Sequence, residues 1–190
     1  VHQRALARAR LPHDGDHFAS IDGQRDPAVM IDWTTGGSEV SGLVEFMARN
    51  IDDVYISHGE LQDGRATDHH HWSPRLRDVL AEELDSCVGG APSPDAMGRL
   101  AVGRLSGVVV SVMMVEIHRA ASTPYAVLQD LVVERAHRGA GVGRSNLRWL
   151  ERRLTEEGIG RLFLESGSKN QAAHRFFARN GFSRCSIVMF

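Results

Sequence analysis

Three consecutive runs of β-branched residues, separated by short turns, constrain the fold of this 190-residue chain more than any other feature. The runs are 99–105 (RLAVGRL), 107–119 (GVVVSVMMVEIHR) and 125–133 (YAVLQDLVV). Valine and isoleucine favour strands, and connections this short join antiparallel neighbours, because a parallel pair needs a crossover of a dozen residues or more. The middle of the chain therefore predicts an antiparallel β-meander.

Segments with helical spacing lie on both sides of this meander. Before it, we expect a strand over 28–34, one long helix or two within 39–59, a loop over 63–72 and a helix over 73–84. After it, we expect a helix over 144–158, a strand over 161–166, a helix over 170–181 and a last strand or hairpin over 182–190. This order predicts one α/β domain over 28–190, with a mixed, mostly antiparallel central sheet flanked by helices.

Residues 1–27 show neither the helical nor the strand period. They are expected to be an N-terminal arm, disordered or a cloning remnant, and we assign them no function.

Composition excludes several classes of partner. The formal net charge of −2, with histidine neutral, gives no basic field for nucleic acid or an anionic membrane, and no stretch reaches the roughly 20 apolar residues of a membrane span. Cys87 and Cys185 stand far apart, which favours unpaired thiols in a reducing compartment. We expect a cytoplasmic protein, monomer or homodimer. No metal is expected, since His69, His70 and His71 lack the spacing of a structural site.

A glycine-rich turn, HRGAGVGRS over 137–145, follows the last run of the meander and opens the next helix. At such a position several backbone N–H groups point outward at the positive end of the helix dipole. A Cβ on any of the three alternating glycines would obstruct the backbone or forbid a positive φ: Gly139, Gly141 and Gly143. The flanking arginines, Arg138 and Arg144, add positive charge. The turn predicts a site for a phosphate or diphosphate. The plainer alternative is a turn that only joins strand and helix.

Two familiar phosphate loops fit this turn poorly. The P-loop would need glycine where Arg138 stands. The dinucleotide fingerprint G-x-G-x-x-G needs a parallel βαβ unit, whereas these glycines alternate and the preceding strands are expected to be antiparallel.

A third pattern fits better. The segment DLVVERAHRGAGVGRSNL resembles the acyl-CoA loop of the GNAT superfamily of N-acyltransferases, whose signature is Arg or Gln, two residues, Gly, one residue, then Gly or Ala; Arg138, Gly141 and Gly143 match it. A second segment, NQAAHRFFARNGF, is similar to another signature of the family, with matches at Asn170, Ala173, Phe176, Gly181 and Phe182. The resemblance covers roughly residues 30–190, and the family's order of elements agrees with the one predicted above.

The resemblance implies a GNAT-like fold with acetyl-CoA as co-substrate. The backbone of Leu131, Val132 and Val133 would run along the pantetheine arm like an added strand. The diphosphate would be held by backbone N–H groups of the turn: Arg138, Gly139, Ala140, Gly141, Val142, Gly143 and Arg144. Asn170 would contact the distal arm, and Phe176 and Phe177 would line the thioester end. Taken alone, Asn170 is more typical of a helix N-cap and the phenylalanines of a core.

The implied reaction moves an acetyl group to an amine within a ternary complex. A lysine-like amine has a pKa near 10.4, so its neutral form at pH 7 costs about 4.6 kcal/mol, and a base is useful. Glu165 matches the position where many similar acetyltransferases keep a carboxylate, and it is our first candidate; the alternative is a carboxylate that only structures the strand-to-helix corner. Asp130 and Glu116 on neighbouring strands are weaker candidates, as strand alternation can turn either away.

One departure from the family favours a second class of function. Many members have tyrosine where this chain has Phe177, which cannot donate a proton to the departing thiolate. A degenerate acyl-CoA-binding sensor or scaffold without turnover is therefore the alternative. The acceptor amine, a small molecule or a peptide, is not identified by the sequence. Acidic residues of the loop after the first helices could attract a cationic amine, or form an ordinary solvated loop: Glu60, Asp63 and Asp68.

Overall fold

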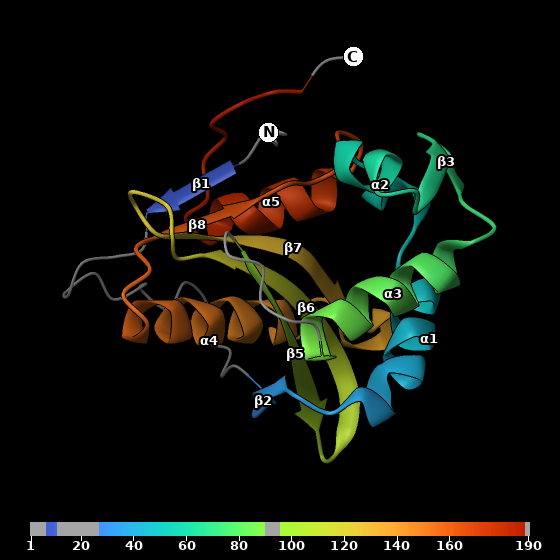
Figure 1. Cartoon of the computed structure of the whole chain (residues 1–190), viewed down its shortest axis with the longest axis horizontal. Helices are drawn as coiled ribbons and strands as arrows, with labels where there is room; N and C mark the ends of the chain where they lie inside the picture. The colour runs from blue at the N-terminus through green and yellow to red at the C-terminus, as the bar shows by residue number, and fades with distance from the viewer. Residues whose placement is uncertain (1–6, 11–26, 90–95, 189–190) are drawn as a thin grey trace.

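The computed structural model describes residues 7–10, 27–89 and 96–188. A six-stranded sheet forms its centre, as the ribbon in Figure 1 shows. The strand order is β1-β8-β7-β6-β5-β2. β7 and β8 are parallel, and all other neighbours in this sheet are antiparallel. The strands are β1 (Ala7–Arg10), β2 (Met30–Thr34), β5 (Met97–Leu105), β6 (Val108–His118), β7 (Tyr125–Val133) and β8 (Arg161–Leu164).

Five α-helices accompany this sheet in the described ranges. They are α1 (Val40–Asn50), α2 (His58–Gln62), α3 (Leu76–Gly89), α4 (Val142–Glu156) and α5 (Gln171–Arg179). Short 3-10 turns precede α1 and α2, as η1 (Gly37–Glu39) and η2 (Asp53–Tyr55). Within the same ranges, no helix combines the length and the apolar character that crossing a bilayer would require.

The helices cover both faces of the sheet and bury a core on each. On one face, Leu147, Leu150 and Leu154 of α4 pack with sheet residues such as Met113 and Leu162. On the other face, α1 and α3 bury their apolar stripes against Leu100, Val112 and Val132, among others. The strands of the meander are therefore apolar on both faces, which is why their sequences read as nearly continuous apolar runs.

The predicted fold class is confirmed: the sheet is mixed and mostly antiparallel, with helices on both faces. The segment 39–59 contains two helices, because α1 ends at Asn50 and a 3-10 turn intervenes before α2. The loop expected over 63–72 was wrong in part. It contains a small hairpin of β3 (Ala66–Asp68) and β4 (His71–Trp72).

Both ends of the chain differ from expectation. Residues 182–190 were expected to form a last strand, but the described part, up to Val188, contains only an isolated bridge at Ser183. The outer edge of β8 is already occupied, since Ala7–Arg10 pairs with all four of its residues. β1 lies beside β8 in Figure 1. β1, which lies in a segment where no strand was expected, therefore occupies the edge of β8 at which a C-terminal strand could have paired.

Candidate active site

The cleft begins where β7 and β8 separate. The two strands pair over only three residues, ending with Leu128 opposite Leu164. β7 then continues to Val133 with β6 on one side and no β8 partner on the other. Gln129 has no partner in the register with β6, and such a bulge bends a strand and increases its twist. Residues 129–133 therefore form an open edge inside the sheet.

This open edge leads to the start of α4. Gly139 and Gly141 in the connecting turn have φ of +79° and +87°, a region that residues with a Cβ rarely adopt. Gly141 is the N-cap, and no side chain caps the helix. The first N–H groups of α4 are therefore left without an intrahelical or capping acceptor. The positive φ expected of the turn is present at these two glycines.

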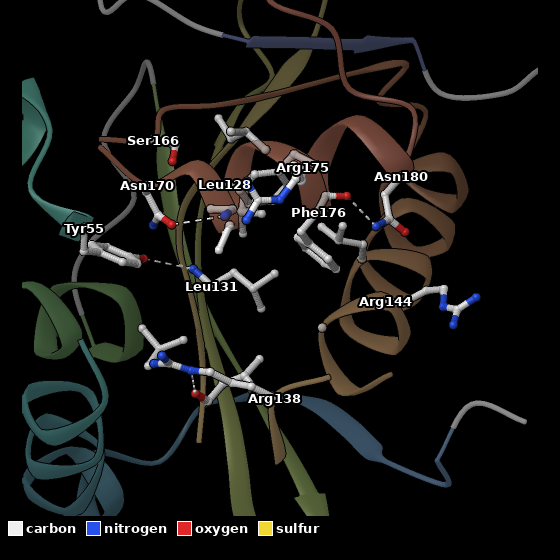
Figure 2. Close-up of a pocket in the computed structure, with 18 of the residues that line it drawn as sticks. Tyr55, Leu128, Leu131, Arg138, Arg144, Ser166, Asn170, Arg175, Phe176 and Asn180 are labelled. Atoms are coloured by element: carbon white, nitrogen blue, oxygen red, sulfur yellow. Dashed lines mark hydrogen bonds between the residues drawn. The ribbon is translucent and has the colours of Figure 1, made fainter. Parts of the chain in front are cut away.

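Gly143 is required for a different reason. It lies in the first turn of α4, where an added Cβ would come within 3.0 Å of Cζ of Phe176. The absence of a side chain lets the phenyl ring pack directly against the helix start. Phe176 therefore forms a wall of the cleft beside the uncapped N–H groups (Figure 2).

The cleft has a volume of about 1220 Å³ and opens between the β7 edge, the start of α4 and α5. Most of the residues predicted from the resemblance line it: Leu131, Val132, Val133, Arg138, Gly139, Gly141, Gly143, Arg144, Asn170, Phe176 and Phe177. Two of them do not. Ala140 is absent from the lining, and Val142 is fully buried beneath the turn.

Two side chains cap the open edge of β7. The N–H of Leu131 donates to Tyr55 Oη at 3.4 Å, and Arg138 Nε donates to the carbonyl oxygen of Val133 at 3.2 Å. Figure 2 shows both contacts at the border of the cleft. The N–H of Leu131 and the carbonyl oxygen of Val133, two residues apart, thus face the cleft. An added strand forms hydrogen bonds with backbone groups at this spacing.

Asn170 and Phe177 lie at the α5 side of the cleft. Asn170 is the N-cap of α5 and accepts from the N–H of Ala173 at 3.1 Å, as the plainer interpretation of this residue predicts. The Phe177 ring packs edge-on against Phe176 and Phe182, with centroids 5.2 and 5.5 Å apart. Neither ring carries a polar atom, so this wall is apolar.

Glu165 follows β8 directly and lies where the strands separate. Its Oε1 accepts from Ser57 Oγ at 2.7 Å and from the N–H of Gly59 at 3.1 Å. Its Oε2 is buried and has no hydrogen-bond partner among the described residues; His58 Nδ1 is 3.8 Å away. One carboxyl oxygen is therefore fixed by two donors, and the other is buried without a hydrogen-bond partner in a residue that lines the cleft.

Gly167 brings the loop after β8 against η2. A Cβ at this position would lie 2.5–3.0 Å from the carbonyl oxygens of Ile56, Val54 and Tyr55. Only glycine permits so close an approach to backbone. The contact holds the segment carrying Glu165 beside the segment that carries Tyr55 and Ser57.

Asp130 points away from the cleft into a buried ionic cluster. It is 1 % exposed, and its two oxygens accept from Arg65 Nη1 and Nη2 at 3.0 and 2.9 Å. Tyr55 Oη also donates to it at 3.0 Å. Arg65 further contacts Glu83 at 2.6 Å and Glu60 at 3.8 Å. Asp130 lines a second, small cavity of about 30 Å³ rather than the main cleft.

Burial of this cluster shifts several pKa values upward. Burial raises the pKa of Tyr55 well above its usual value, and the Asp130 carboxylate raises it further. The pKa of Glu60 is raised by burial and then by Asp130, and burial raises the pKa of Glu83. The neutral forms of Glu60 and Glu83 are therefore favoured relative to those of exposed glutamates.

Several of these residues were not found from the sequence. Tyr55 matches no signature of the family, and Arg65 lies in the segment expected to be a loop. Glu60, expected either to attract a cationic amine or to lie in a solvated loop, is buried as the partner of Ser57 in a capping box at the start of α2. The spacing S-x-x-E at 57–60 is the signature of that box. Asp68 pairs with His71, and no group suited to a metal ion occurs in the described ranges.

Comparison with known proteins identifies the family. The model of the acetyltransferase (GNAT) family matches residues 59–182, which is more than half of the chain. The chain belongs to the GNAT acetyltransferase family. None of the curated protein sequences matches it significantly.

Solved GNAT structures share the fold at low sequence identity. The PaiA N-acetyltransferase of Thermoplasma acidophilum, in complex with coenzyme A, is 15% identical with a TM-score of 0.57, over 82% of this chain and 90% of that one. A ribosomal-protein-alanine N-acetyltransferase of Brucella melitensis biovar Abortus 2308 is 10% identical, with a TM-score of 0.56 over 86% and 97%. An aminoglycoside acetyltransferase from an uncultured soil metagenomic sample, in complex with trehalose, is 13% identical, with a TM-score of 0.56 over 85% and 93%.

The GNAT match includes the β7 edge, the glycine turn and Glu165, but it begins after Tyr55 and Ser57. Tyr55 contacts Leu131, and Ser57 contacts Glu165. Both residues lie outside the matched range, in the segment between α1 and α2.

The buried cluster of this GNAT domain should contribute strongly to stability. Replacing Arg65 by Ala leaves Asp130 buried without its guanidinium, and we expect the free energy of unfolding to fall by about 3–5 kcal/mol, measured by urea denaturation. Arg77 forms a comparable contact with Glu45 at 2.7 Å, but on the surface. Arg77→Ala should change stability little, and equal losses in the two variants would contradict a special role of the buried cluster.

Glu151 of α4, which lines the cleft, should make the stability of the protein depend on pH. Burial raises its pKa from 4.5 to about 7, against the opposing effect of Arg148. Between these values the folded protein holds a proton that the unfolded chain releases, so the contribution of Glu151 to stability falls as the pH rises through this window.

Glu151→Gln should therefore raise the melting temperature clearly at pH 8 and much less at pH 5. The substitution removes a carboxylate whose burial is unfavourable only when it is ionised. Thermal unfolding at the two pH values measures the difference. A gain of the same size at both would show that the ionisation of Glu151 is not the cause.

Proposed function

We propose that this GNAT domain transfers an acetyl group from acetyl-CoA to an amine, directly and within a ternary complex. The observation that carries the proposal is the meeting of two features in one cleft: the open edge of β7 over 129–133 and the uncapped start of α4. A strand edge pairs with an extended amide chain, and a helix start favours a diphosphate. Coenzyme A joins a peptide-like pantetheine arm to a diphosphate.

The residues of this chain would then have distinct binding roles. Tyr55 and Arg138 would release Leu131 and Val133, whose backbone groups orient the arm. N–H groups at the start of α4, supported by the charge of Arg144, would hold the diphosphate. Phe176 and Phe177 would exclude water from the cleft beside Asn170. The bound acetyl-CoA supplies an acyl group activated as a thioester.

Glu165 is the base that we propose. A lysine-like ammonium must lose a proton before it can attack, at a cost of about 4.6 kcal/mol at pH 7, and a positioned base assists this step. Two observations support this role: Glu165 lines the cleft beside the point where the strands separate, and its Oε2 has no hydrogen-bond partner among the described residues. Asp130 is no longer proposed as a base, because both of its oxygens bind Arg65. It is instead a positioning residue that holds Tyr55.

Phe177 cannot donate a proton to the departing thiolate, and this favours a second candidate function. A thiol has a pKa near 8.5, so a thiolate is a tolerable leaving group and solvent can protonate it. A protein that binds acyl-CoA as a sensor, without turnover, would also be compatible with an apolar Phe177.

The acceptor is proposed only by class, as a small-molecule or peptide amine, since the structural neighbours named above differ in theirs. Cys87 and Cys185 are free thiols, which is compatible with a reducing compartment such as the cytoplasm. We propose a monomer or homodimer without a nucleic-acid partner.

Thiol release from acetyl-CoA tests the enzymatic function directly. It should be followed against a panel of amines, aminoglycosides and peptides, with wild type and Glu165→Gln. We expect release with at least one acceptor and a loss in the variant that is largest near neutral pH, where the ammonium form dominates. Tight binding of acetyl-CoA with no release from any acceptor would favour the sensor.

Gly141→Asp tests the diphosphate site separately. We expect the dissociation constant of coenzyme A to rise at least about tenfold, because a Cβ strains the positive φ and the carboxylate repels phosphate. Isothermal titration calorimetry measures the change. Gly64→Asp is the matched control, since Gly64 also has a positive φ, +78°, but does not line the cleft. The assignment of the turn would be wrong if both variants bound coenzyme A like wild type.

A further inference from the structure

Ser57 stands between two carboxyl groups, at hydrogen-bond distance from both. Its Oγ lies 2.6 Å from Glu60 Oε2 and 2.7 Å from Glu165 Oε1. Both are ordinary O–H···O distances, yet a serine hydroxyl has only one hydrogen to donate. If both carboxyls were ionised, one of the two contacts would join two oxygens with no proton between them. The geometry therefore calls for one additional proton, on Glu60 or on Glu165.

The neighbouring backbone groups do not provide this proton. The N–H of Ser57 donates to Glu60 Oε2 at 2.7 Å. The N–H of Gly59 lies 3.2 Å from Ser57 Oγ and 3.1 Å from Glu165 Oε1. These bonds hold the three side chains in place. The Gly59 N–H is shared between Ser57 Oγ and Glu165 Oε1, but a backbone amide does not supply the proton of the O–H···O contact between them.

The surroundings favour a neutral carboxyl at Glu60. Glu60 is 7 % exposed, and burial followed by the charge of Asp130 raises its pKa. The ionisable groups facing the two carboxyls come from four segments: Tyr55, His58, Asp63, Arg65, Glu83 and Asp130. Arg65 is the fixed cation of this set, and it is shared among three carboxyls. A second negative charge beside Glu60 is therefore poorly compensated.

We propose that Glu60, Ser57 and Glu165 form a carboxyl–hydroxyl–carboxyl relay that holds one shared proton. The proton can reside on Glu60, with Ser57 donating to Glu165, or on Glu165, with Ser57 donating to Glu60. The two arrangements differ by the concerted shift of two protons along the hydroxyl. Glu60 is a buried residue of α2, and both Glu60 and Glu165 belong to the lining of the main cleft.

The relay gives Glu165 a property that a single carboxylate lacks. Two coupled carboxyls lose their protons in two separated steps, and the last proton leaves at a higher pH than it would from either group alone. A base poised closer to neutral pH removes a proton from an ammonium more effectively. This role rests on the proposed function, whereas the shared proton does not.

The proton balance of the proposed transfer is then complete. An alkylammonium loses two protons as its nitrogen forms the bond to the acetyl carbon and the carbon–sulfur bond breaks. One proton passes to Glu165 while the shared proton resides on Glu60, and it returns to solvent from Glu165 when the product leaves. The other ends on the departing sulfur. Ser57 lies between the two carboxyl groups, and Glu60 reaches Glu165 only through its hydroxyl, so Ser57 and Glu60 are positioning and relay residues.

Carbon-13 NMR of the glutamate carboxyl groups tests the shared proton in the free protein. Titrations from pH 3 to 9 would compare wild type with Glu60→Gln, Glu165→Gln and Ser57→Ala. Glutamine is accepted at this position of a capping box, so Glu60→Gln keeps the acceptor for the Ser57 N–H but cannot hold the proton. Glu82→Gln, on the exposed face of α3, is the matched control.

In wild type we expect the signals of Glu60 and Glu165 to titrate together in two steps. In Glu60→Gln the remaining Glu165 signal should follow one step, with its last proton lost at least about one pH unit lower. Glu165→Gln should have the reciprocal effect on Glu60, which provides a second measurement should Glu60→Gln fold poorly. Glu82→Gln should change neither curve. Independent one-step curves that do not respond to either substitution would overturn the relay.

Kinetics separate failure of the relay from failure of the proposed function. With an acceptor from the panel, the acidic limb of the pH–rate profile should move to lower pH in Glu60→Gln, while Ser57→Thr, which keeps the hydroxyl, should behave like wild type. A purely structural capping role would alter the melting temperature and leave the limb in place, contradicting the proposal. Coupled NMR titrations in a protein that releases no thiol would refute the transfer reaction but not the relay.

Discussion

The separation of β7 from β8 after Leu128 is the constraint on which the rest of the site depends. A sheet normally satisfies the backbone groups of its interior strands, but here two strands of one sheet diverge and leave residues 129–133 without a partner on one side. The bulge at Gln129 bends β7 at this point. Because β7 runs directly into the glycine turn and α4, the same divergence places an open strand edge beside an uncapped helix start.

Two further sets of contacts gather ionisable groups at the end of the cleft where β7 and β8 separate. Gly167 lets the loop after β8 approach the backbone of η2, and Ser57 then meets Glu165 across that contact. Below them, Arg65 and Asp130 hold Tyr55 at the N–H of Leu131. The proton-handling groups therefore collect where the strands part, and the anion-binding groups collect at the start of α4. The open edge of β7 connects the two.

Local pattern was enough to predict the meander, the glycine turn and the helix that follows it, because each depends on residues close in sequence. Most of the predicted cleft-lining residues, and Glu165 as candidate base, came from the family resemblance. Tyr55, Ser57 and Arg65 were not, since their roles come from contacts across 76, 108 and 65 positions in sequence, with Leu131, Glu165 and Asp130. The contacts of Asp130 with Tyr55 and Arg65 could not be predicted for the same reason. β1 was missed because its alternation, Ala-Arg-Ala-Arg, covers only four residues, and the partner that makes it a strand is the distant edge of β8.

Amide hydrogen exchange in the presence of coenzyme A tests the central claim most directly, namely that the β7 edge and the start of α4 together hold the ligand. Mass spectrometry of peptides covering 129–145 would be compared with a peptide from β5, which lies two strands away in the sheet. The account predicts slower exchange of the Leu131, Val133 and first α4 amides at saturating coenzyme A, with β5 unchanged. Saturable binding that leaves exchange in 129–145 unaltered would contradict it.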